Sequence, residues 1–188
     1  MRSGLIALVC VIFTVGSPRV SHALEAAALQ RLLQEGKARE LRYVEIRESP
    51  HLPKPRESRG SLRATSESLE KRVEWPRKET WRILADRMDW ISGDGSLVKS
   101  VRFDKAPAAE ALADGLRLAV SGDLMALQQR FTVSIDGGTS DWCVTLKPRD
   151  AQLARFIEAL TITGVGGTMM TLVVVEVRGG RTTTELLH

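Results

Sequence analysis

The chain has 188 residues, and its 27 basic and 23 acidic side chains give a net charge of +4. Without the first 23 residues, which hold Arg2 and Arg19 and no acid, the net charge is +2, which argues against a nucleic-acid partner. Cys143 is then the one cysteine left, so the core and not an intramolecular disulfide must stabilise the fold. The remaining length suits one domain, which buries roughly 70% of the surface of its unfolded chain.

Residues 1–23 are predicted to be a secretory signal peptide. The apolar run at residues 5–15 is too short to span a bilayer. Small residues at positions 21 and 23 fit signal-peptidase cleavage before Leu24. The alternative is an uncleaved membrane anchor, against which both features argue. We therefore expect one exported domain at residues 24–188, located in the periplasm.

The first half of this domain reads as a helix followed by antiparallel strands. Leucines at helical spacing predict an amphipathic helix over residues 24–34. Three prolines within residues 50–55 form a loop and exclude a central strand there. The runs that follow alternate apolar and charged residues, which indicates strands with one wet and one dry face. Strands are expected at residues 39–49, 60–63, 69–75, 79–85, 87–92 and 97–104.

Three of the four tryptophans fall within residues 69–92. The alternation predicts that Trp75, Trp81 and Trp90 all project to the dry face, where only Lys71 interrupts the apolar row. These large aromatic side chains either fill a closed core or line a cavity.

Helices interrupt the strands in the middle of the chain. Residues 107–121 carry alanines and leucines at helical spacing behind Pro107, and Asp123 is suited to cap a second helix at residues 124–129. One helical turn is expected at residues 151–156. Further strands are expected at residues 131–136, 142–146, 159–163, 169–177 and 181–187. The fold class is therefore α+β: a curved antiparallel sheet of about ten or eleven strands whose concave apolar face is covered by helices.

Motifs for catalysis, metals and cofactors are missing from the predicted domain. His51 lies in the proline-rich loop and His188 is the last residue, and neither has metal-ligand spacing to other donors. Cys143 alternates with Trp142 and Val144, as a packed strand residue does. We expect no enzyme, no metal and no cofactor. The enzyme alternative, such as a lipid hydrolase, would require His51 or Cys143.

The order of several short motifs resembles the LolA family of periplasmic outer-membrane lipoprotein carriers, closest to its divergent LolA-related branch. These motifs are Gly60-Ser61-Leu62, Trp75-Pro76, the run from Trp142 to Pro148 and the run from Glu176 to Thr182. The resemblance implies an incomplete β-barrel, with helices as a lid over an apolar cavity that holds the acyl chains of a lipoprotein or another lipid-linked amphiphile or glycolipid. It also implies a monomer without reaction or cofactor, served by an inner-membrane exporter and an outer-membrane acceptor.

One motif of the family's lipoprotein carriers is missing. They carry an Arg-Pro step that helps to hold the lid closed, and the corresponding place here reads Thr65-Ser66-Glu67-Ser68. The role of that arginine transfers to no residue of this chain, which leaves a cargo other than a lipoprotein open.

Apolar and aromatic residues of the predicted strands are the candidates for lipid contact. For each of them, packing of the sheet against its helices is the alternative. The candidates are Val73, Trp75, Trp81, Ile83, Trp90, Phe103, Phe131, Val133, Trp142, Val144 and Leu146.

The second hypothesis for the function is a lipid-sensing regulatory module of the same fold. Such a protein would contact a membrane signalling protein through the loop at residues 50–55 and the basic front half of the chain. The length of one domain favours the carrier.

Overall fold

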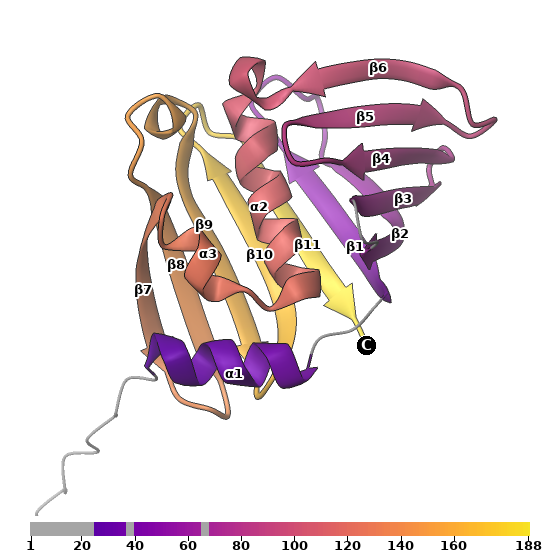
Figure 1. Ribbon diagram of the computed structural model, residues 1–188. Coiled ribbons are helices and arrows are strands. Elements are labelled where there is room, and N and C mark those ends of the chain that lie inside the picture. The colour runs from indigo at the N-terminus through magenta and orange to yellow at the C-terminus, as the bar shows by residue number, and fades with distance from the viewer. Residues whose placement is uncertain (1–24, 37–39, 65–67) are drawn as a thin grey trace, which may run out of the picture.

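The computed structural model describes residues 25–36, 40–64 and 68–188 (Figure 1). The predicted signal peptide and positions 65–67 of the missing Arg-Pro step lie outside these residues. Within the described part of the chain, no helix is both long and apolar enough to cross a membrane.

One antiparallel sheet organises the described chain. Its eleven strands run in the order β6-β5-β4-β3-β2-β1-β11-β10-β9-β8-β7. Every neighbouring pair is a hairpin or a short connection except β1 and β11, which join the two ends of the chain along seven residue pairs. The described residues of β6 and β7 do not pair with each other, so the sheet is an open, incomplete barrel. The strands are β1 (Glu40–Glu48), β2 (Arg56–Ala64), β3 (Leu69–Trp75), β4 (Glu79–Ile83), β5 (Arg87–Ser92), β6 (Leu97–Arg102), β7 (Phe131–Gly137), β8 (Trp142–Pro148), β9 (Ile157–Val165), β10 (Thr168–Glu176) and β11 (Arg181–Leu187).

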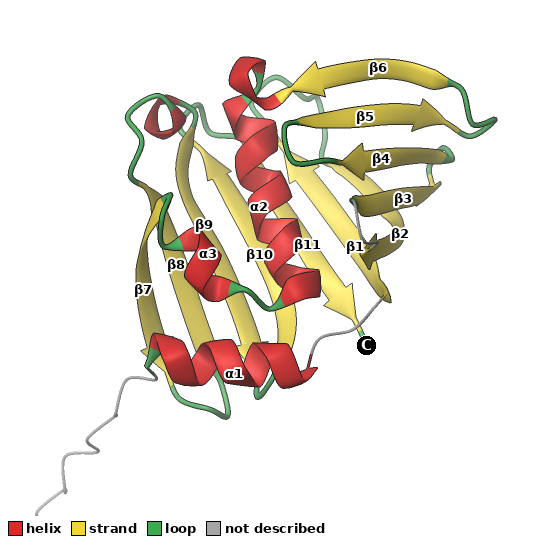
Figure 2. Cartoon of the chain, in the orientation of Figure 1, coloured by secondary structure: helices red, strands yellow, loops and turns green. Residues whose placement is uncertain are grey.

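Three α-helices, α1 (Ala26–Gly36), α2 (Pro107–Ser121) and α3 (Leu124–Leu127), lie on one face of the β7–β11 half of the sheet (Figure 2). Two 3₁₀ turns, η1 (Phe103–Lys105) and η2 (Leu153–Arg155), connect elements. The helix α2 reaches from β9 and β10 across to β2, so it bridges the two halves of the sheet. The expected fold class is confirmed.

The middle of α2 packs very close to the sheet because residue 115 is a glycine. A Cβ there would lie 2.9 Å from Cδ1 of Leu172 and 3.3 Å from Cδ2 of Leu160. Glycine weakens a helix interior by about 1 kcal/mol. Here it lets two leucines of β9 and β10 touch the helix backbone, which explains its place inside the helix.

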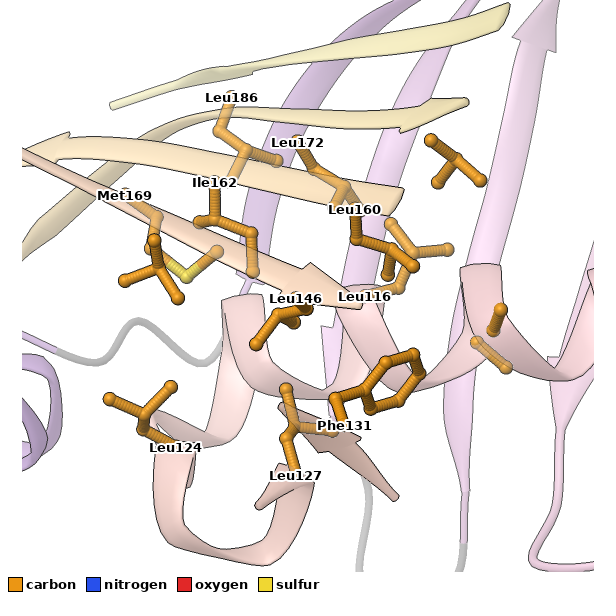
Figure 3. Close-up of a cluster of buried hydrophobic side chains, with 14 of the residues drawn as sticks. Leu116, Leu124, Leu127, Phe131, Leu146, Leu160, Ile162, Met169, Leu172 and Leu186 are labelled. Carbon is orange, nitrogen blue, oxygen red and sulfur yellow. The ribbon is translucent and has the colours of Figure 1, made fainter. Parts of the chain in front are cut away.

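The main hydrophobic core lies between the helices and the β7–β11 half. Figure 3 shows Leu116 of α2, Leu124 and Leu127 of α3 and Phe131 facing the strands, and each is at most 6% exposed. The strand residues that complete this cluster are Leu146, Leu160, Ile162, Met169, Leu172 and Leu186.

Several element boundaries differ from the predicted ones, and two of them have a clear physical cause. The strand β2 begins at Arg56, four residues before the predicted start, because its polar residues pair with β1 from Arg47↔Arg56 onward. The predicted turn at residues 151–156 is η2, and Asp150 fixes its start by accepting hydrogen bonds from the backbone N–H groups of Gln152 and Leu153. Strand pairing and the hydrogen bonds of Asp150 set these two boundaries, whereas the prediction relied on the spacing of apolar residues.

Candidate functional site

A cavity of about 940 Å³ lies between α2 and the curved β1–β5 part of the sheet. Ligand sites for small molecules range from about 300 to 1,000 Å³. The cavity is therefore large enough for a sizeable organic ligand. The solid core on the other side of α2 belongs to the β7–β11 half of the sheet.

One wall of the cavity is a single face of α2. Ala109, Leu112, Ala113 and Leu116 all line it, at the i, i+3, i+4 and i+7 spacing of one helix face. Opposite them, the sheet contributes an apolar surface. Its members are Val73, Trp81, Ile83, Met88 and Val174.

Buried ion pairs hold α2 in place. Asp114, 6% exposed, accepts a hydrogen bond from Arg117 at 3.0 Å and another from Arg130 at 2.5 Å. Burial raises the pKa of the Asp114 carboxyl, against the opposing effect of Arg130 and Arg117. Arg117 also donates to the backbone carbonyl of Leu84 at the end of β4, which ties the helix to the curled strands. The two walls of the cavity are thus fixed to each other.

The sheet wall also contains a buried ion pair, Lys71–Glu45. Lys71 Nζ lies 2.6 Å from both carboxylate oxygens of Glu45, and the two side chains are 9% and 13% exposed. The Thr184 hydroxyl donates to the same carboxylate at 3.0 Å. The ammonium also lies 5.0 Å from the centre of the Tyr43 ring. Burial and the nearby Glu45 raise the pKa of the Tyr43 hydroxyl. Lys71 therefore interrupts the apolar row on the dry face, as the sequence indicated, and finds its partner two strands away.

Trp81 and Trp90 form a stacked pair on β4 and β5, with ring centres 5.6 Å apart and planes inclined by 10°. Both indole N–H groups donate to the carboxylate of Glu79, at 3.1 Å and 2.9 Å. Trp81 lines the cavity, whereas Trp90 is not among the lining residues. One carboxylate thus fixes the orientation of an aromatic surface at the cavity wall.

Trp75 does not face the cavity, and the prediction that it does is wrong. A β-bulge shifts the register between β2 and β3, so that Gly60 pairs with Val73 but Arg59 pairs with Trp75. Trp75 is therefore turned to the outer face with Arg59, whose guanidinium lies 5.6 Å from the ring, and it is 50% exposed. A Cβ at Gly60 would lie 1.8 Å from the carbonyl oxygen of Arg72, so the close approach of β2 to β3 at this position requires glycine.

Of the other predicted site residues, Val73 and Ile83 line the cavity together with Trp81. Contact of these three with a lipid stays a prediction. The remaining candidates belong to the core or pack against it and do not line the cavity, because the helices cover the β7–β11 half of the sheet and Phe103 is buried in η1. They are Phe103, Phe131, Val133, Trp142, Val144 and Leu146.

The prediction missed the helical wall and the cavity end. The family resemblance implied helices as a lid over a cavity, but no residue of this α2 face was among the candidates for lipid contact. Nothing in the local sequence marks Met88 or Phe156 as a cavity residue. Phe156 belongs to no regular element and reaches the cavity from the position after η2.

The described residues contain no group of three or more metal-binding side chains. His188 lies against the backbone of β10, with Nε2 2.7 Å from the carbonyl oxygen of Met169, far along the chain from His51. The cavity therefore offers an apolar surface and charged side chains for binding a ligand.

Three comparisons place the chain among known proteins. The family described as "Outer membrane lipoprotein carrier protein LolA-like" matches residues 18–187. No curated protein sequence matches. Among solved structures, the LolA superfamily protein NE2245 from Nitrosomonas europaea has 8% identity and a TM-score of 0.47, over 88% of this chain and 93% of that one.

A second solved structure, MucB, has 12% identity and a TM-score of 0.44, over 86% of this chain. This chain spans 56% of the MucB chain, so it corresponds to about half of that protein. The family match, in contrast, covers nearly the whole sequence, and the chain belongs to the LolA-like family of outer membrane lipoprotein carrier proteins.

Proposed function

We propose that this protein is a non-catalytic periplasmic carrier that shields the acyl chains of a lipoprotein or a lipid-linked amphiphile between the inner and outer membranes. The observation that carries the proposal is the 940 Å³ cavity, in which one apolar face of α2 stands opposite Ile83, Met88 and Val174. The family's printed description, a lipoprotein carrier, supports the same reading.

The energetics of an acyl chain fit such a wall. Each buried methylene is worth about 0.8 kcal/mol, so a sixteen-carbon chain hides about 12 kcal/mol of exposure to water. A carrier must offset this cost and still release its cargo. Apolar surfaces such as Leu112 and Met88 bind without fixed hydrogen bonds, and methionine adapts to irregular shapes. Release to an acceptor then needs no specific bond to break.

The cell biology of the proposal follows from the sequence. Export by the signal peptide at residues 1–23 would deliver the protein to the periplasm. An inner-membrane exporter would supply the cargo and an outer-membrane acceptor would receive it. Purification of the protein from its own cell envelope with such partners would support the carrier. Recovery of a membrane signalling protein in their place would favour the regulatory module.

Filling the cavity should abolish lipid uptake. In Ala109→Phe the new ring projects from the α2 face into the cavity, so we expect at least tenfold weaker binding of a fluorescent fatty-acid probe. Binding is measured by the increase in probe emission on titration with the protein. The matched control is Ala126→Phe on α3, where the side chain is exposed and outside the cavity, and it should bind as the wild type does. Equal binding of the probe by the two variants, or no binding by the wild type, would contradict the proposal.

A further inference from the structure

Cations outnumber anions in the lining of the cavity. Of the lining residues, five are cations, Arg47, Arg56, Lys71, Arg77 and Lys105, and three are anions. The three carboxylates are already engaged. Lys71 holds Glu45, Arg47 lies 3.4 Å from Glu176, and Glu79 accepts both indole N–H groups. Arg56, Arg77 and Lys105 make no ion pair with any described carboxylate.

The strand register brings two of these cations together. Arg47 and Arg56 are direct partners across β1 and β2, and both side chains line the cavity. Like charges directly opposite each other destabilise a sheet. Glu176, 3.4 Å from Arg47, partly compensates that arginine. An anion seated between the two strands would remove this repulsion.

The other two cations, Arg77 and Lys105, line the same cavity. Arg77 follows β3, whose last residue Trp75 pairs with Arg59, close to the start of β2. Lys105 ends η1, directly before the N-terminus of α2, and lines the cavity with Ala106. In Figure 1 the N-terminal end of α2 and the end of β1 lie toward the same end of the sheet. The helix N-terminus adds a partial positive charge there.

The cavity therefore combines one apolar helix face with cations that pair with no described carboxylate. Lys105 lies in η1, just before α2, and the apolar face of the helix runs from Ala109 to Leu116 along the same cavity. An anionic amphiphile presents a phosphate or carboxylate next to its acyl chain, which suits a lining that combines cations with an apolar helix face.

We propose that the cargo is an anionic amphiphile, whose phosphate or carboxylate headgroup binds Arg56, Arg77 and Lys105 while its acyl chain lies along α2. The assignment rests on the proposed function and specifies its cargo class. Guanidinium groups suit such headgroups because they bind phosphate and carboxylate with two parallel hydrogen bonds.

The test compares headgroups on one tail. The full-length exported protein is loaded with the neutral probe phenylnaphthylamine, which is displaced by dodecyl phosphate, dodecyl maltoside or dodecyltrimethylammonium below their micelle concentrations. Dodecyl phosphate should bind at least tenfold more tightly than the other two, and its advantage should shrink with added salt.

Variants locate the headgroup. The triple variant Arg56→Gln, Arg77→Gln, Lys105→Gln should lose about tenfold or more in affinity for dodecyl phosphate and keep its affinity for dodecyl maltoside. The control triple variant Arg31→Gln, Lys147→Gln, Arg178→Gln makes the same change of charge at exposed positions outside the cavity and should bind both as the wild type does.

Four outcomes contradict the assignment. Equal binding of all three headgroups, or equal loss in the two triple variants, refutes the anionic headgroup while leaving the carrier intact. Displacement by inorganic phosphate as effective as that by dodecyl phosphate would show a simple anion site. Failure of the wild type to take up the probe at all would refute the carrier itself.

Discussion

Replacing Lys71 with methionine should lower the free energy of unfolding by about 3 kcal/mol, because it leaves a buried carboxylate without its cation. Among the described residues, Glu45 would keep only the Thr184 hydroxyl as a partner, in a wall where its side chain is 13% exposed. The loss is measured by urea unfolding of the variant and the wild type, followed by far-UV circular dichroism.

Two further variants separate this effect from simple charge removal. Arg42→Met breaks the pair with Glu74, whose side chains are 64% and 46% exposed, and should cost less than about 1 kcal/mol. The double variant Lys71→Met, Glu45→Gln removes the unpaired charge and should recover most of the stability lost in Lys71→Met. A double variant that is less stable than Lys71→Met would contradict the account of the pair.

Replacing Phe131 with alanine should destabilise the protein by about 3–5 kcal/mol, because the ring is fully buried in the core beneath α2 and α3 (Figure 3). The matched change Phe156→Ala removes a ring that is 45% exposed and lines the cavity. We expect it to cost under about 1.5 kcal/mol of stability. The urea midpoint of each variant reports the difference.

Binding of the fatty-acid probe should depend on the cavity residue and not on the core residue. Phe156→Ala should weaken uptake of the fatty-acid probe, whereas folded Phe131→Ala protein, kept well below its denaturation midpoint, should bind as the wild type does. Similar stability losses in the two variants, or a binding defect confined to Phe131→Ala, would show that core and cavity are divided differently from the present description.

Local patterns sufficed for most of the sheet. Short hairpins and strands with one wet face show directly in the alternation, and the helix α2 shows in the spacing of its alanines and leucines. The open antiparallel sheet with helices on one face follows from these elements and from the family resemblance. Boundaries set by polar pairing, such as the start of β2 at Arg56, leave no such trace.

The candidate site was predicted less well because it depends on long-range geometry. A one-residue bulge opposite Gly60 turns Trp75 outward, although its alternation with Val73 predicts the dry face. The partner of Lys71 is 26 residues away on another strand, so its burial could not be read locally. The strands that bear Phe131 and Trp142 are as apolar as a cavity wall, and only the placement of the helices makes them core.

The most direct test of the account is quenching of tryptophan emission by a fatty acid with a brominated chain, because bromine quenches only indoles that it touches. Trp81 lines the cavity and stacks on Trp90, whereas Trp75 is on the outer face and Trp142 is buried in the core. The brominated chain should therefore quench the wild type and Trp75→Phe alike, and should quench the double variant Trp81→Phe, Trp90→Phe very little. Undiminished quenching in that double variant, or its loss in Trp75→Phe, would contradict an acyl chain lying in this cavity.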